Sequence, residues 1–192
     1  IRIDPELRAR QRLTQSRGVT LQLLPAGNPV RLRLPDDGRL GTPGWSSDGK
    51  RFVLLHAKAG GSEVWVGEAA TGTVRLLKGV RVGETVMRGA AWLSDNRTLL
   101  VATVPRAIGA APARPPVPEG PNMEESAGKK TQVATFQDLL RTEFDAKLFA
   151  YFALSQPALV DVVTGRVTEI GKPDFYIDVE ESPDGSHFLA TR

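Results

Sequence analysis

The sequence holds few side chains that could act as a nucleophile or a general base. Ser186 and His187 are adjacent, but successive residues along a strand point to opposite faces, so we expect no nucleophile and base pair there. Ser62 follows two glycines but lacks the second flanking glycine of a Gly-x-Ser-x-Gly elbow. His56 closes an apolar run, which favours a strand-end residue over a general base. These residues therefore predict no catalytic site within the chain.

Other reaction types find little support in the residue types. The paired acids Glu124–Glu125 and Glu180–Glu181 have no partner that the sequence can supply. With no Cys and only two His, the chain has neither a thiol nucleophile nor the ligands of a zinc ribbon or a His-rich metal site. Gly60 and Gly61 lack the Lys and the Ser or Thr that complete a phosphate loop. We expect no metal and no cofactor.

Composition favours a folded chain and narrows its partners. Of the 192 residues, 41% are hydrophobic and 24% are charged, as in ordinary globular proteins. No apolar run approaches the roughly 20 residues of a membrane helix, so no membrane span is predicted. The net charge of +3 comes from residues 1–39, where eight Arg face four acids. This basic segment lacks the aromatic residues that stack on bases, so we expect no nucleic-acid partner.

A turn motif recurs along the chain and indicates which elements must position these side chains. The copies WSSDGKRFVL, WLSDNRTLLV and ESPDGSHFL, with a weaker copy FDAKLF, place an aspartate at Asp48, Asp95, Asp184 and Asp145, respectively. Asp and Gly suit tight turns because Asp bonds its own backbone and Gly accepts positive φ angles. The aspartates are therefore interpreted as hairpin turns and not as calcium ligands or catalytic groups.

A second set of turn residues alternates with the first. A glycine separates two apolar, strand-length runs at Gly27, Gly72 and Gly165. Each unit thus consists of an Asp turn, a strand, a loop, a second strand, a Gly turn and a third strand. Small antiparallel sheets repeated every 40 to 50 residues are typical of a β-propeller. The sequence predicts an all-β fold of four-stranded antiparallel blades over residues 1–192, about four blades' worth of a partial ring.

One unit carries a long insertion. Residues 105–134 hold six of the fourteen prolines, which favours an extended surface or pore-facing loop and excludes a central strand. A short helix is predicted over 135–141, with Thr135 as N-cap and Asp138 three residues later. Long ordered loops in compact repeats are often functional, so this insertion is the best candidate for a specialised role.

Several motifs, in this order, resemble a known family. VPEGPNMEESAGKK, TFQDLL, DAKLFAYFALSQ and ESPDGSHFLATR are similar to the propeller region of the prolyl oligopeptidase family, most closely to its glutamyl endopeptidase-like branch. The similarity runs from Val19 to Arg192, and TFQDLL and DAKLFAYF are its specific parts. One departure lies at 105–109, where the family pattern has an Arg directly before the Gly. Arg106 either substitutes for that residue or the role is missing.

The resemblance implies a seven-bladed propeller that caps a separate α/β-hydrolase domain with a Ser, Asp and His triad. That C-terminal domain is absent from these 192 residues, so we expect a fragment with unpaired blade edges. The implied function is a substrate-gating propeller of a serine peptidase that hydrolyses peptides, with cleavage after acidic residues as its implied preference. Arg106 and Arg114 would lie near the pore or the domain interface. A periplasmic or secreted location follows from the resemblance alone.

Two readings from other classes stay open at this point. The chain could belong to a non-enzymatic propeller that scaffolds protein partners, which predicts a complete ring of repeats and no peptidase activity. The arginines around Arg8 and Arg17 could instead bind nucleic acid, which predicts binding that weakens steeply with salt.

Overall fold

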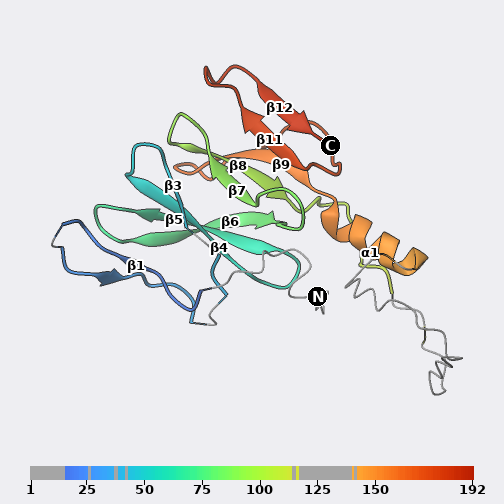
Figure 1. Cartoon of the computed structure of the whole chain (residues 1–192), viewed down its shortest axis with the longest axis horizontal. Helices are drawn as coiled ribbons and strands as arrows, with labels where there is room; N and C mark the ends of the chain where they lie inside the picture. Colours follow the sequence, from blue (N-terminus) through green and yellow to red (C-terminus); the bar gives the residue numbers. More distant parts are fainter. Residues whose placement is uncertain are drawn as a thin grey trace, which may run out of the picture.

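A computed structural model describes residues 16–25, 27–36, 39–41, 43–113, 116, 140 and 142–192. This part of the chain is mostly β, its strands pair antiparallel, and it contains one α-helix (Figure 1). The predicted all-β antiparallel class is therefore confirmed. No helix in the described residues is long and apolar enough to cross a membrane.

The strands form two sets of four that are consecutive in sequence. The first unit comprises β3 (Gly44–Trp45), β4 (Arg51–His56), β5 (Ser62–Glu68) and β6 (Val74–Val82). The second unit comprises β7 (Ala90–Trp92), β8 (Thr98–Thr103), β9 (Gln156–Asp161) and β10 (Val167–Glu169). One pair, Val82 with Thr103, joins the two units.

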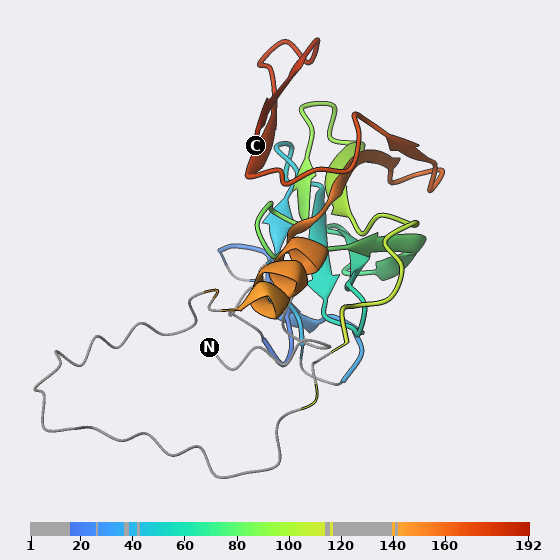
Figure 2. The same cartoon turned by 90° about the vertical axis from the view of Figure 1, so that its right-hand side faces the viewer.

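A two-stranded hairpin flanks the units on either side. One pairs β1 (Thr20–Leu21) with β2 (Val30–Arg31), and the other pairs β11 (Asp178–Glu181) with β12 (Phe188–Thr191). The hairpins lie at opposite ends of the molecule with the two units between them (Figures 1 and 2).

The predicted Asp turns stand where the repeat puts them. Asp48, Asp95 and Asp184 lie in the β3–β4, β7–β8 and β11–β12 turns, respectively. Each carboxylate accepts the backbone N–H two residues on, at 3.0, 2.9 and 3.1 Å in chain order. The prediction of hairpin turns at these three positions is confirmed.

The weaker copy of the motif is not a turn. Asp145 is the third residue of α1 (Glu143–Ala153), so the predicted repeat turn at Asp145 is wrong. Thr142 Oγ1 accepts the Asp145 N–H at 3.1 Å, and the Asp145 carboxylate accepts the Thr142 N–H at 2.9 Å. This reciprocal capping box starts a helix, and the residues after it include no β-branched side chain, Gly or Pro that would oppose its continuation.

The rest of the predicted insertion is only partly tested. Residues 105–113 follow β8 without regular structure, and α1 occupies the end of the β8–β9 connection, beside the strands (Figure 1). The helix predicted over 135–141 lies outside the described residues apart from Leu140, which is not helical. The remainder of 105–134 lies outside them as well, apart from residue 116.

The core consists of three apolar clusters that separate successive sheets. Alternate residues of one strand contribute to different clusters, because side chains alternate across a strand. On β4, Phe52 packs toward Leu32, on the side of the first hairpin, while Val53 packs toward the second unit. On β8, Leu99 faces the first unit and Leu100 faces the last hairpin. Each unit is therefore buried on both faces by its neighbours.

Candidate binding pocket

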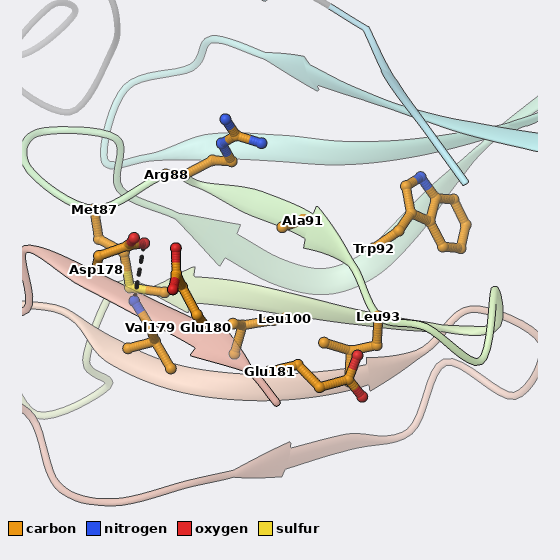
Figure 3. Close-up of a pocket in the computed structure, with 10 residues that line it drawn as sticks. All are labelled: Met87, Arg88, Ala91, Trp92, Leu93, Leu100, Asp178, Val179, Glu180 and Glu181. Atoms are coloured by element: carbon orange, nitrogen blue, oxygen red, sulfur yellow. Dashed lines mark hydrogen bonds between the residues drawn. The ribbon is translucent and has the colours of Figure 1, made fainter. Parts of the chain in front are cut away.

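A pocket of about 420 Å³ opens between β7 and β11, where the second unit meets the last hairpin (Figure 3). Ten residues from these two strands, their flanks and β8 line it: Met87, Arg88, Ala91, Trp92, Leu93, Leu100, Asp178, Val179, Glu180 and Glu181. A volume of this size lies within the range of ligand sites in proteins.

The pocket has an apolar floor and a charged rim. Met87, Leu93, Leu100 and Val179 belong to one buried cluster, so the floor is part of the core. The rim carries three carboxylates and one guanidinium, from Asp178, Glu180, Glu181 and Arg88. This separation follows from the alternation along β11, where Val179 is buried while Asp178 and Glu180 are exposed.

Hydrogen bonds fix part of the rim. Glu181 Oε2 accepts the backbone N–H of Ser94 at 2.7 Å, which ties β11 to the β7–β8 turn. Asp178 Oδ1 accepts the Val179 N–H at 3.0 Å. Asp178 and Glu180 are two residues apart on β11 and therefore project from the same face of the strand. The guanidinium of Arg88 points away from both (Figure 3).

The rim is not arranged as a metal site. Within the described residues, no group of three or more His, Cys, Asp or Glu side chains could hold a metal ion. The three acids are spread along one strand instead of converging on a point, as ligands of a divalent ion must.

Ser186 and His187 are in contact, contrary to the sequence-based prediction. Ser186 Oγ lies 2.6 Å from His187 Nδ1, because both residues belong to the β11–β12 turn, ahead of β12, where strand alternation does not apply. Ser186 Oγ also donates to the Asp184 carboxylate, at 2.7 and 2.8 Å. A hydroxyl has one hydrogen to donate. Because Ser186 Oγ donates it to the Asp184 carboxylate, His187 Nδ1 must act as the donor in its contact with the serine oxygen.

The Asp184 cluster therefore stabilises the turn and does not activate a nucleophile. A catalytic base must accept the hydroxyl proton, and here Asp184 accepts it. Hydrogen bonds from the hydroxyls of Ser182 and Ser186 lower the pKa of Asp184 to about 2. At neutral pH, Asp184 is thus a charged turn acceptor.

His56 is the last residue of β4 and is fully buried, which confirms its interpretation as a strand-end residue. Its Nδ1 lies 3.2 Å from Oε2 of Glu63, its cross-strand partner. Glu63 also accepts the Trp65 indole N–H at 3.4 Å and pairs with Arg81 at 3.3 Å. Burial raises the pKa of Glu63, but the bonds from His56 and Trp65 and the charge of Arg81 outweigh it, and the pKa is lowered.

The remaining predicted residues lie apart from the pocket. Arg106 is exposed in a turn after β8, where the Ile108 N–H bonds the Pro105 carbonyl at 3.2 Å, and it does not line the pocket. The Tyr151 hydroxyl of α1 donates to the Gly109 carbonyl at 3.1 Å, which ties this segment to the helix. Arg114 lies outside the described residues.

The pocket is not apparent from the sequence, although two of the residues that line it, Glu180 and Glu181, stand out there as paired acids. The two walls are 90 residues apart in the chain, and only the repeat register could have paired them. Since the motifs at Trp92 and Glu181 are equivalent copies, the strands that carry them occupy equivalent places in neighbouring units. That equivalence is the signal that could have brought β7 and β11 together.

Comparison with curated proteins finds relatives over the whole chain, whereas no family model matches it. The chain is 36% identical over its full length to a protein named probable glutamyl endopeptidase, chloroplastic, from Arabidopsis thaliana. It is 32% identical over 98% of its length to a protein of the same name from Oryza sativa subsp. japonica. The chain spans 21% of the length of each of these relatives.

Solved structures with a similar arrangement are more distant in sequence. TolB from Acinetobacter baumannii matches 96% of this chain at 13% identity, with a TM-score of 0.47 and 32% of that structure covered. The acylaminoacyl peptidase of Pyrococcus horikoshii matches 83% of the chain at 16% identity, with a TM-score of 0.43 and 21% of that structure covered.

Proposed function

We propose that this chain forms part of a substrate-gating β-propeller of a serine peptidase. Its predicted resemblance to the glutamyl endopeptidase-like branch of the prolyl oligopeptidase family is confirmed by relatives along the chain. The match of 98% or more of this chain to two proteins named probable glutamyl endopeptidase, of which it spans 21% each, carries this proposal. In it, residues 1–192 supply propeller blades, and a hydrolase domain elsewhere in the whole protein supplies the catalytic triad.

The packing of the sheets supports a propeller. Each four-stranded unit repeats the same turns and is buried on both faces by its neighbours, through the three apolar clusters. Radial repetition of small antiparallel sheets produces this burial, and it leaves the first strands of neighbouring units, such as β7 and β11, close together.

The chemistry of the described residues supports a gating role over a catalytic one. His56 is buried against Glu63, and the Ser186 proton is held by Asp184, so neither group is set up to attack a peptide bond. In the proposal, the propeller admits extended peptides and excludes folded proteins. Cleavage after acidic residues is the preference that the names of the relatives suggest.

Arg106 and Arg114 are proposed to lie near the pore or the domain interface. Arg106 is exposed, and its segment is held by the bond from Tyr151 to Gly109, so the loop is anchored to α1. An anchored, exposed guanidinium can bind a carboxylate of a substrate or of the hydrolase domain.

Peptidase assays of the full-length protein test the proposal. We expect cleavage of unstructured peptides, no cleavage of a stably folded protein that contains the same sequence, and products that end in Glu or Asp by mass spectrometry. Replacing Arg106 by Ala should lower kcat/KM several-fold, while Arg166→Ala, an exposed change in the β9–β10 turn, should leave it unchanged.

Three outcomes of these assays would contradict the proposal or part of it. A full-length protein that binds other proteins but cleaves no peptide would support a non-enzymatic scaffold instead. Equal cleavage of folded and unfolded substrates would contradict gating. An unchanged kcat/KM in the Arg106→Ala variant would remove Arg106 from the proposed site.

A further inference from the structure

We propose that the pocket between β7 and β11 binds a basic side chain, Lys or Arg, of the peptide that the propeller admits. This inference rests on the proposed function, because it names a class of peptide that the same domain would select. It concerns a part of the substrate away from the cleaved bond.

The floor of the pocket suits the aliphatic part of a basic side chain. Met87, Leu93 and Leu100 are buried core residues that the pocket nevertheless reaches. Lys and Arg bury their methylene stems along apolar surface while their charged ends remain at a polar rim. A short acidic side chain has no such stem to place on this floor.

The rim supplies charge of the opposite sign. Three carboxylates of β11 line one side of the opening, against one guanidinium on the other, and Figure 3 shows that Arg88 points away from Asp178 and Glu180. In the described part of the chain, no ion pair connects Arg88 with these acids. Asp178 and Glu180 project from the same face of β11, roughly 7 Å apart along the strand, so a cation at the opening is attracted by both.

The hydrogen bond between the Glu181 side chain and the backbone of Ser94 keeps this rim in place before a ligand binds. Its Oε2 is held at 2.7 Å from the Ser94 N–H, so β11 cannot move away from the β7–β8 turn without losing that bond. A preformed rim lowers the ordering cost of binding.

The occupant is a side chain and not a bare ion. The pocket of about 420 Å³ is far larger than a metal ion needs, and no metal-binding group exists among the described residues. An acid-lined pocket repels acidic side chains, so we expect the basic residue to lie at a distance from an acidic cleavage position. The propeller would then favour peptides of mixed charge.

Binding of hydrolysis-resistant peptides to the full-length protein tests the inference. The peptides carry N-methylated bonds and a fluorophore, have one sequence, and differ at one position that holds Lys, Arg, norleucine or Glu. By fluorescence anisotropy, we expect the Lys and Arg peptides to bind at least about threefold tighter than norleucine, as for a partly exposed ion pair, and the Glu peptide to bind weakest.

Two variants and a matched control separate the pocket from overall charge. Glu180→Gln and Asp178→Asn should each remove most of the preference for Lys over norleucine, and Glu180→Lys should reverse it in favour of the Glu peptide. Glu169→Gln removes the same charge from an exposed position on β10, outside the pocket, and should leave the preference intact.

Equal binding of the Lys and norleucine peptides, or an equal loss of preference in the Glu169→Gln control, would overturn the inference. Both readouts are independent of catalysis. A protein that cleaves peptides without this preference would leave the proposed function standing, and a protein with the preference but without cleavage would leave the pocket standing.

Discussion

The two four-stranded units have the same pattern of strand pairing, but the segments that connect their middle strands differ. In the first unit, residues 57–61 join β4 to β5, whereas in the second, residues 104–155 join β8 to β9 and include α1. Both units nevertheless keep the same Asp turn and have an ion pair beside it. Arg51 pairs with Glu68 across the strands of the first unit, and Arg97, in the turn before β8, pairs with Asp161 in the second. The ladder thus tolerates a long insertion at this loop, because the loop lies outside the turns that set the register.

The units also differ in how they fill equivalent positions. Phe52 stands opposite Gly67 in the first unit, and at the same place in the second unit Leu99 stands opposite Val160. A Cβ on Gly67 would overlap the Phe52 ring, so the large residue of this pair requires the small one. In the second unit, the two side chains of the pair are similar in size. The combined volume of the pair, and not the size of either residue, is therefore what the packing requires.

The largest loss of stability is expected when one residue of the Phe52–Gly67 pair is replaced by its counterpart from the second unit. Gly67→Val should lower the free energy of unfolding by about 3 kcal/mol, because the new side chain overpacks a fully buried ring. The double variant with Phe52→Leu recreates the pair of the second unit and should recover at least half of the loss. Denaturant unfolding of wild type, both single variants and the double variant measures this coupling.

Phe52→Leu alone is the control, with an expected cost of about 1 to 2 kcal/mol for the cavity it leaves. If the double variant is as unstable as the two single variants combined, the positions are independent and the two pairs are not equivalent.

The Asp turns allow a finer comparison. Asp95 accepts the backbone N–H groups of Arg97 and Thr98 and the Thr98 hydroxyl, at 2.9, 2.7 and 2.6 Å. Within the described residues, Asp48 accepts the Lys50 N–H and the Ser46 hydroxyl, at 3.0 and 2.7 Å, and its Oδ2 lies 3.9 Å from the exposed Lys50 ammonium. Asp95→Ala should therefore cost about 1 to 2 kcal/mol and exceed the cost of Asp48→Ala in thermal unfolding. The reverse order would show that bonds within the turn do not decide its stability.

Much of this ladder could be predicted from sequence, because its determinants are local. An Asp two residues before a backbone N–H forms its turn with little help from distant residues, so Asp48, Asp95 and Asp184 were placed correctly. Asp145 lies in a helix and not in a turn because it forms a capping box with Thr142, a signal that is equally local but that the similarity to the turn motif obscures.

The pocket depended on information that no local pattern carries. Arg88 and Glu180 line one pocket only because successive units stack, and the depth of the pocket is set by the packing of Leu100 and Val179. The contact of Ser186 with His187 was missed for a smaller reason. The strand was expected to begin earlier than Phe188, and alternation was applied to residues of the turn.

The contribution of Asp161, at the end of β9, to the stability of the second unit should depend on pH. The Thr164 N–H, followed by the side chain of Arg97 and the Val163 N–H, lowers the pKa of Asp161 from 3.8 to about 2. Since the folded pKa lies below the unfolded one, the stabilisation is complete above about pH 4 and is lost as the pH falls toward 2. Asp161→Asn should thus be less stable than wild type at pH 6, and the gap should close near pH 2. A gap that stays constant with pH would contradict an ionic contribution.

The smallest effect is expected at the one turn that departs from glycine. Asn96 has a φ of 55°, where the equivalent Gly49 and Gly185 have 68° and 70°. Its Oδ1 accepts from the Ser47 hydroxyl at 2.8 Å and from the Asp48 N–H at 3.0 Å, which links the turns of the two units. Asn96→Gly relieves the strain of a positive φ but loses both bonds, so these opposing terms should leave a net loss of less than about 1 kcal/mol. Asn96→Ala loses the bonds and keeps the strain, so unfolding midpoints should rank Asn above Gly above Ala. A Gly variant as stable as wild type would mean that the relief of strain fully offsets the two lost bonds, and an Ala variant as stable as wild type would mean that the link between the turns contributes nothing.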